Sequence, residues 1–352
     1  MKTLDIYIAR AVLVGVLVAL FVICAVDWLG DLFYQVSRMG GDDRFSDVLI
    51  FTLLDIPHKL FEFLPSSMLI GALLSLGQFA ASSELVAVGA SGYSRMRVGI
   101  VSSATGLLIT LLLSIFVESY MPYGEKISLS LNKQNNENIL LASDQSYWLK
   151  DQNRFIRVGQ AVSQDLLNDV DIYQFNNQGE IEVISQTEGA IKQQGEWQLQ
   201  NYRSSIFATN TVSSVNEENY HMPQLFFDNL LQSVASDPFK MSIQRLYSNI
   251  FYLEENRLDS SEYQVALFKR FAVPFVGLSM LLLALPLVFR PRQMGGAGQR
   301  LLIGIVIALV IYIAVEAITN GAIVFQLSPV IVAFLPVVII LTCSMFAFRF
   351  VR

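Results

Sequence analysis

Few side chains in this sequence have the types and spacing that covalent chemistry needs. Its two histidines, His58 and His221, are far apart in the chain, and no HExxH, CxxC or GxSxG pattern occurs. The phosphate-binding loop of ATPases is also missing. We therefore expect a non-enzymatic protein that does not hydrolyse ATP by itself and has no catalytic residues, metal site or cofactor. A membrane hydrolase without a recognisable motif is the weaker alternative.

The stretch that indicates a function is residues 71–97, GALLSLGQFAASSELVAVGASGYSRMR. It begins inside an uncharged run that is long enough to cross a bilayer core of roughly 30 Å. Glu84 ends that run, a short apolar segment follows, and Arg95 and Arg97 precede a second uncharged run. The short segment is therefore held between two membrane spans.

A short helix over residues 82–92 is predicted within this stretch. Ser82 or Ser83 would cap its start, Glu84 suits the positive N-terminal end of a helix, and Gly92 would close it. Two interpretations stay open: an ordinary hairpin between two spans, or a docking helix that receives force from a soluble partner. The residues that would form the dock are Ser83, Glu84, Leu85, Val86, Gly89, Ala90, Ser91 and Gly92.

The composition is that of a membrane protein. The chain has 352 residues, of which 53% are hydrophobic and only 15% charged. The formal net charge of −6 comes from the middle of the chain, because residues 121–264 hold 19 acidic and 10 basic residues. No basic surface of the kind that binds nucleic acid is expected. Both cysteines, Cys24 and Cys343, lie in apolar segments, so the middle of the chain has no disulfide.

Six apolar segments approach or reach the roughly 20 residues that a spanning helix needs. They are Ala11–Val26, a segment that ends at Ser83 and starts as early as Val48, Val98–Val117, Phe271–Phe289, Leu301–Val324 and Val330–Phe348. We predict a membrane α-helical fold with six transmembrane helices, three on each side of an inserted domain. The predicted parts are residues 1–120 with the short helix 82–92, residues 121–263, and residues 264–352.

The inserted domain is predicted to be all-β. It contains short runs of strand-forming residues that alternate with Asn-, Gln- and Gly-rich turns. The predicted strands are Ser146–Lys150, Arg154–Val158, Val170–Phe175, Ile181–Ile184, Trp197–Tyr202 and Ser205–Ala208. Strands at this spacing are typical of a sandwich or an open barrel. Apolar residues at helical spacing over Ser242–Glu254 predict a linker helix before the fourth span.

The distribution of Lys and Arg predicts the orientation. The segments assigned to the inside hold nine basic residues against Asp5 and Glu84, whereas residues 27–62 hold three basic and seven acidic residues. Both termini and the hairpin are therefore predicted to be cytoplasmic, and the inserted domain lies outside. Glu316 is the clear charge within a span. It is interpreted as an interfacial residue or, alternatively, as a polar contact with another subunit or a substrate.

These residues carry a resemblance to a known family. The run Gly71-Ala72-Leu73-Leu74, through Ser83-Glu84-Leu85-Val86, to Ala90-Ser91-Gly92, set within a three-plus-three arrangement of spans, is similar to the YjgP/YjgQ permeases. These are the LptF and LptG subunits of the lipopolysaccharide exporter of Gram-negative bacteria. Ile56-Pro57, Gly298-Gln299-Arg300 and the chain end at Arg352 resemble LptG more than LptF.

The resemblance implies a permease subunit of an ABC transporter. Such a subunit pairs with an LptF-like paralogue, and a cytoplasmic dimer of LptB-like ATPases docks on helix 82–92. Lipopolysaccharide is taken from the outer leaflet of the inner membrane and passed along a β-jellyroll-like periplasmic domain to LptC-like and LptA-like proteins. The chain would then be a multi-pass protein of the Gram-negative inner membrane, in contact with membrane lipid.

Lipopolysaccharide carries phosphates, which cations near the outer leaflet would bind. The candidates are Arg38, His58, Lys59, Lys133, Lys269 and Arg270. Three of them, Arg38 and the pair His58-Lys59, fall where the family places basic residues, whereas Asp31 falls where the family often has a cation. The other interpretation makes these cations interfacial anchors. An alternative function is a mechanically coupled ABC membrane protein that drives a periplasmic partner without moving lipid.

Overall fold

The chain divides into two units, which are described separately. The computed structural model describes residues 2–38, 44–134, 146–163, 165–176, 178–193, 195–208, 211–223, 225, 237–289, 297–324 and 327–349. The first unit, here the membrane unit, comprises Met1–Glu125, Ser242–Leu246 and Ser261–Arg352. The second, here the strand unit, comprises Lys126–Met241 and Tyr247–Ser260.

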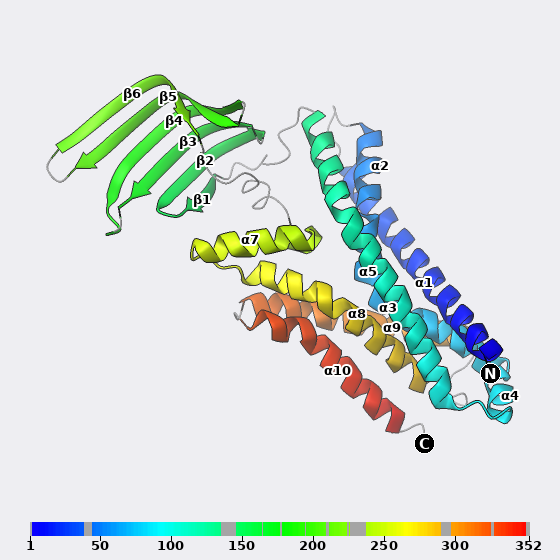
Figure 1. Cartoon of the computed structure of the whole chain (residues 1–352). Helices are drawn as coiled ribbons and strands as arrows, with labels where there is room; N and C mark the ends of the chain where they lie inside the picture. Colours follow the sequence, from blue (N-terminus) through cyan, green and yellow to red (C-terminus); the bar gives the residue numbers. More distant parts are fainter. Residues whose placement is uncertain are drawn as a thin grey trace. The chain divides into compact units, whose positions relative to one another are not determined.

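Six of the described helices are long and apolar enough to cross a membrane, as the sequence predicts. These six are α1, α3, α5, α8, α9 and α10 (Figure 1). The helices have the following bounds: α1 Lys2–Ser37, α2 Phe45–Leu54, α3 Ile56–Ala81, α4 Glu84–Ala90, α5 Arg95–Gln134, α7 Ile243–Glu255, α8 Ser261–Val288, α9 Ala297–Val324 and α10 Pro329–Arg349. The linker helix predicted from the sequence is confirmed as α7.

The second apolar segment is two helices rather than one that starts at Val48. Helix α2 ends at Leu54, and α3 begins at Ile56 with a proline, Pro57, in its first turn. Proline lacks the N–H group that a continuous helix would use, and it restricts the residue before it. The break therefore follows from the sequence Asp55-Ile56-Pro57. The hydropathy pattern alone does not show where this segment divides into two helices.

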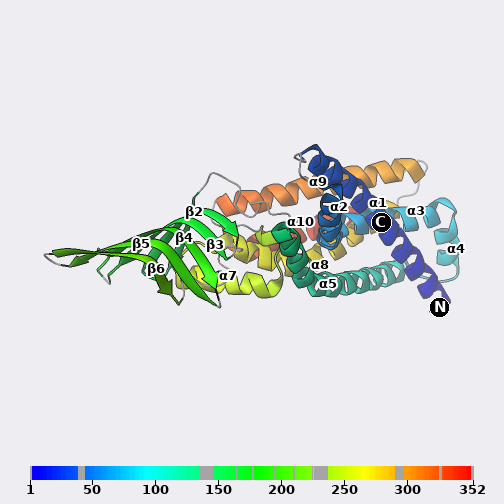
Figure 2. The same cartoon turned by 90° about the horizontal axis from the view of Figure 1, so that it is seen from above.

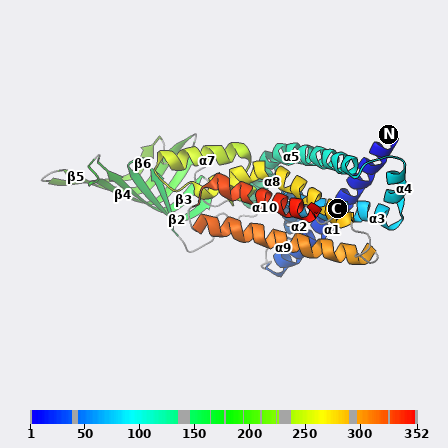
Figure 3. The same ribbon diagram turned by 90° about the horizontal axis from the view of Figure 1, so that it is seen from below.

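Helix α3 is central to the membrane unit. It packs against α1, α8 and α9, and its buried residues form one apolar core with those of α1 and α8. Helices α8 and α10 lie between α5 and α9, as the views from above and below show (Figures 2 and 3). Leu64, Met68 and Leu76 on α3 are all fully buried. This explains why α3 and α8 are more buried than the other spanning helices.

Helices α1 and α3 touch through their backbones. A β-carbon added to Gly71 would lie 2.4 Å from the Cα of Val16, and one added to Gly15 would lie 2.6 Å from the carbonyl oxygen of Gly71. Small residues allow such close approach between helices in membranes, where packing rather than the hydrophobic effect holds helices together. Gly71 is the first residue of the run that carries the family resemblance. Its lack of a side chain lets α1 pack directly against the backbone of α3.

The strand unit contains one antiparallel sheet in sequential order, β1 to β6, as the described strands show. The all-β prediction is confirmed, and the described strands form a meander (Figure 1). Two predicted strands, at 197–202 and 205–208, are parts of one long strand. The bounds are β1 Tyr147–Asp151, β2 Arg154–Ser163, β3 Leu166–Phe175, β4 Ile181–Gln193, β5 Glu196–Ala208 and β6 Thr211–Met222.

One strand was missed by the sequence prediction. Strand β6 has the sequence TVSSVNEENYHM, and all but two of its residues are exposed. It pairs antiparallel with β5 along its whole length: Met222 lies opposite Trp197 at one end, and Thr211 lies opposite Ala208 at the other. Because its side chains are exposed on both faces of the sheet, β6 does not need apolar residues, and its composition resembles that of a loop.

The close approach of α1 and α3 gives the first prediction. Gly71→Val should lower the melting temperature of the purified full-length chain markedly, because the added side chain collides with backbone atoms that cannot rotate away. Overpacking of this kind costs about 1–3 kcal/mol or more. Gly30→Val is the matched control on α1, since nothing lies within 4 Å of a β-carbon there. Equal melting temperatures for the two variants would show that the helices do not cross at Gly71.

Candidate functional site

The hairpin between α3 and α5 contains a short helix, as the sequence predicts. Helix α4 spans Glu84–Ala90, and Gly92 closes it with a φ of +84° and an N–H bond to the carbonyl of Gly89 at 3.0 Å. The predicted serine cap is wrong. Ser83 has a φ of +61° and its side chain caps nothing. The side chains of Leu85 and Val86 lie outside the described residues.

Glu84 joins the hairpin to α1. The hydroxyl of Tyr7 donates to Oε2 of Glu84 at 3.0 Å, and the hydroxyl of Ser82 donates to Oε1 at 2.7 Å. The ring of Tyr7 also stacks on Phe79 of α3, with the centroids 5.0 Å apart. Glu84 is among the residues that the sequence predicts to bind a partner. In the structure its carboxylate already accepts hydrogen bonds from two hydroxyls of this chain.

A second link joins α1 to the start of α5. The Nε and Nη2 atoms of Arg97 donate to the two oxygens of Asp5 at 3.1 and 2.8 Å, and the Tyr93 hydroxyl donates to the same carboxylate. Arg97 also lies over the Tyr93 ring, 5.3 Å from its centroid. Burial, followed by the bond to Asp5, raises the pKa of Tyr93, which keeps it a donor at neutral pH. We call Asp5, Tyr7, Glu84, Tyr93 and Arg97 the hairpin clamp.

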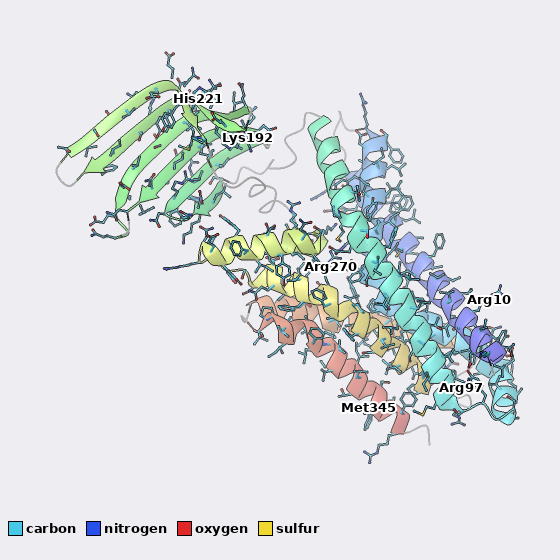
Figure 4. All side chains as sticks on the ribbon, in the orientation of Figure 1. Arg10, Arg97, Lys192, His221, Arg270 and Met345 are labelled. Atoms are coloured by element: carbon cyan, nitrogen blue, oxygen red, sulfur yellow. The ribbon has the colours of Figure 1, made fainter. Side chains whose placement is uncertain are left out.

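In all three views the N-terminus of α1 lies beside α4 (Figures 1 to 3). Figure 4 labels Arg97 at this end of the unit and Arg270 farther along α8. The described chain has no group of three or more His, Cys, Asp or Glu side chains placed to hold a metal ion.

Lys59 does not present a free cation. It is only 7% exposed, and its ammonium donates to the carboxylates of Asp27 and Asp31 on α1. Asp27 and Asp31 are one helical turn apart, a spacing that places both on one face of α1. That spacing indicates a shared cationic partner but does not identify it as Lys59. Asp31 is thus a partner of Lys59 within the chain.

Arg270 is also held within the protein. It is 9% exposed, its guanidinium lies 5.4 Å from the centroid of the Phe61 ring, and Nη2 lies 3.2 Å from the sulfur of Met121. Lys133 falls in α5, but its side chain lies outside the described residues. Arg38 is exposed just beyond α1, 4.9 Å from the centroid of the Tyr34 ring.

Another predicted residue, Lys269, lines a cavity together with Glu62, Tyr312 and Glu316. The cavity, of about 80 Å³, lies among α3, α8, α9 and α10. Lys269 approaches Glu316 at 3.4 Å, and the Tyr312 hydroxyl donates to Glu62 at 3.0 Å. His58 is not among the residues that line the cavity, but its Nε2 lies 4.0 Å from Oε2 of Glu62. Glu316 therefore makes a polar contact within its own chain, which the interfacial interpretation did not anticipate.

The strand unit has one apolar face. Ile156, Val170 and Leu199 are fully buried on it, and the second half of α7 contributes Tyr252 to the same cluster. The Tyr252 hydroxyl donates to the carbonyl of Lys150. Burial raises the pKa of Tyr252 to about 12, so this bond persists at any physiological pH.

The opposite face of the sheet carries charge. Nη2 of Arg157 contacts Asp169 at 2.9 Å and Asp171 at 2.6 Å. Hydrogen bonds to Asp171 and then Asp169 raise the pKa of Arg157. Ile172 belongs to the apolar face, being 4% exposed, whereas Phe175 lies edge-on to Phe155 outside that cluster. Ile172 and Phe175 therefore lie on different faces of β3, although burial does not alternate strictly along this strand, since Val170, Asp171 and Ile172 are all buried.

Together these features define a class: a multi-pass membrane protein with three helices on each side of an inserted β domain and a short clamped helix between two spans. Comparison with known proteins gives the family. The chain belongs to the family described as "Lipopolysaccharide export system permease LptF/LptG", whose profile matches residues 6–349.

Two relatives carry the same printed name, "Lipopolysaccharide export system permease protein LptG". The protein from Escherichia coli strain K12 is 28% identical over 345 residues, which cover 95% of this chain and 94% of the relative. The protein from Haemophilus influenzae is 26% identical, with 95% of both chains covered. The resemblance identified in the sequence is thereby confirmed.

The contact of the buried Lys59 with Asp27 and Asp31 gives the second prediction. Lys59→Met should destabilise the purified chain by roughly 1–3 kcal/mol, less than the ~3–5 of a fully buried pair because both aspartates are partly exposed. The triple variant Asp27→Asn, Asp31→Asn, Lys59→Met should recover most of that loss, because no unpaired charge remains. Thermal unfolding measures both. If the single variant unfolds like the wild type, Lys59 is not a structural cation.

Proposed function

We propose that this chain is a permease subunit of an ABC transporter that extracts lipopolysaccharide from the outer leaflet of the inner membrane and passes it to a periplasmic bridge. The observation that carries this proposal is α4. It is a short helix between two spans, clamped to α1, in a chain that matches the lipopolysaccharide-export permease family along nearly its whole length. ATP hydrolysis would be done by an LptB-like dimer that docks on α4 from the cytoplasm.

The clamp supports a route by which force would pass. A push on α4 acts directly on Glu84, which is bonded to Tyr7, and on the start of α5, which is bonded to Asp5 through Arg97. Tyr7 and Asp5, the residues that would receive the force, both lie on α1. Because α1 is 36 residues long, or about 54 Å at 1.5 Å per residue, a movement at α4 would reach the opposite membrane surface without passing through a loop.

The opposite ends of the helices are the proposed site of lipid handling. Arg38 remains a candidate for a phosphate contact because it is exposed there. Lys269 lines the cavity with Glu62, and His58 contacts Glu62, so both are candidates only if lipid enters that cavity. Lys59 and Arg270 are better assigned to packing, given their burial.

The strand unit supports a role as a lipid path. Its apolar face would shield acyl chains from water, and its described edge strand β6 offers unpaired backbone groups on one side. A partner strand could extend the sheet there. The proposed partners are an LptF-like permease in the membrane and LptC-like and LptA-like proteins in the periplasm.

Mass spectrometry of the purified complex tests the proposal. It should report an LptF-like chain, an ATPase and bound lipopolysaccharide. A complex that contains both partners but never lipopolysaccharide would favour the alternative, a mechanically coupled protein that moves no lipid.

The third prediction concerns Arg38. Arg38→Glu should reduce the lipopolysaccharide that co-purifies with the complex by several-fold, since a charge-assisted contact contributes roughly 1.5–3 kcal/mol before screening by water. Arg10→Glu, which changes an exposed arginine near the other end of α1, is the control. Equal lipid content in all three proteins, at matched salt, would make Arg38 an interfacial anchor.

The fourth prediction separates docking from clamping at α4. Glu84→Lys should abolish recovery of the ATPase in a pull-down, because it reverses the charge that the partner would meet and leaves Tyr7 without its acceptor. Tyr7→Phe removes only the bond to α1 and should leave recovery intact while lowering ATP-driven transport. If both variants recover the ATPase equally well, Glu84 has no part in docking.

The fifth prediction concerns the face of the sheet that lipid would follow. A photo-crosslinking residue at Ile172 should capture lipopolysaccharide when ATP is supplied to the complex, and the same residue at Phe175 should not. The two positions lie on one strand but on different faces, so each controls for the other. Equal capture at both positions, or at neither, contradicts a path along the apolar face.

A further inference from the structure

A groove lies on the membrane unit away from the sites described above. It has a volume of about 600 Å³ and is formed by α5, α8 and α10, at the same end as α4. Its floor and walls are almost entirely apolar, with Ile100 of α5, Leu285 of α8 and Phe348 of α10 among them. The volume falls within the roughly 300–1,000 Å³ of small-ligand sites. Figure 4 labels Met345 on α10, one turn before Phe348.

The groove is open at a glycine, Gly99, which has no side chain to fill it. Gly99 lies on its floor, and a β-carbon there would be 3.2 Å from Cδ1 of Leu285. The φ of Gly99 is not in the left-handed region, so the backbone does not require glycine at this position. What glycine provides is space between α5 and α8, next to the exposed side chains of Met96 and Ile100.

The mouth of the groove carries an arginine that pairs with no carboxylate of the described chain. Arg95 is exposed and lies 5.9 Å from the centroid of the Phe289 ring, which also lines the groove. Within the described part of the chain no ion pair to Arg95 occurs, whereas Arg97, two residues later, is bound by Asp5. Arg349 follows Phe348 in the last turn of α10 and is likewise exposed.

These features determine the chemistry of an occupant. An acyl chain gains little by leaving the bilayer for an apolar groove, because the lipid around the protein is equally apolar. Selection must therefore come from the head group, and a cation that is not paired within the described chain favours an anion. An apolar groove below an arginine at the membrane surface matches a molecule with acyl chains beneath a phosphate.

We propose that this groove binds one anionic glycerophospholipid, with an acyl chain against Gly99 and Leu285 and the phosphate on Arg95. The site belongs to the α4 end of the membrane unit. In the proposed function, that end faces the leaflet opposite to the one from which lipopolysaccharide is taken. The groove is thus a separate lipid site from the one that would handle the transported substrate.

The test uses the purified complex in detergent with added phosphatidylglycerol or with phosphatidylcholine of the same acyl chains. Native mass spectrometry counts the lipids that stay bound. Arg95→Gln should reduce bound phosphatidylglycerol about fivefold, the equivalent of the roughly 1 kcal/mol that one arginine contributes near an anionic surface. Ile100→Trp, which fills the open side of the groove, should reduce it as well without removing a charge.

Two comparisons make the result specific. Arg10→Gln removes an exposed arginine near the N-terminus of α1, outside the groove, and should leave binding unchanged. Phosphatidylcholine should bind several-fold more weakly to the wild type and should not respond to Arg95→Gln.

Three outcomes overturn the proposal. They are an equal loss in Arg10→Gln, no preference for phosphatidylglycerol over phosphatidylcholine, and a cross-link from Ile100→Cys to a helix of another subunit in place of lipid. Lipopolysaccharide is counted in the same spectra. Its absence from the wild-type complex would refute the proposed function, while specific phosphatidylglycerol binding would still support the groove.

Discussion

The backbone contact between α1 and α3 is the constraint on which the membrane unit depends. Gly15 and Gly71 allow the two helices to touch where any side chain would separate them. Once α1 is seated there, residues such as Val12 and Val16 complete the core that α3 shares with α8. In a bilayer this geometry matters more than hydrophobicity, because every helix surface is apolar and only close packing distinguishes a neighbour from lipid.

That contact is reinforced by polar ties near both ends of α1. Toward the N-terminus Asp5 and Tyr7 bind Arg97 and Glu84 around α4, and toward the other end Asp27 and Asp31 bind Lys59 of α3. Each tie joins α1 to the same continuous segment of chain, α3–α4–α5. In the proposed function, a partner that moves α4 would therefore act on α1 through these ties as well.

The sequence predicts the fold well and the site in part, for reasons that can be stated residue by residue. Apolar segments and strand alternation need only local information, so the six spans and the all-β insertion follow from it. The hairpin at 82–92 is recognisable because Glu84 and Gly92 suit the two ends of a helix. Strand β6 is missed because its polar residues lack the pattern on which strand prediction depends.

The partners of the charged residues were beyond the reach of the sequence. Lys59 and Arg270 look like surface cations when each is considered alone, and only the packing of helices shows that Lys59 meets two aspartates and that Arg270 lies on Phe61. The same is true of Glu84, whose contact with Tyr7 joins residues 77 positions apart. Pairing between distant helices depends on their rotation about their own axes, which hydropathy does not specify for helices that are apolar all round.

A distance measurement across the ATP cycle tests the account most directly. Spin labels would be placed at Phe21 on α1 and at Ser91 after α4, both exposed, in a chain whose Cys24 and Cys343 are replaced by serine. The account predicts the same distance distribution in the nucleotide-free and ATP-trapped complexes, because the clamp makes α1 and α4 move together. A distance that shifts or broadens when ATP binds would contradict it, since α4 would then move against α1 rather than with it.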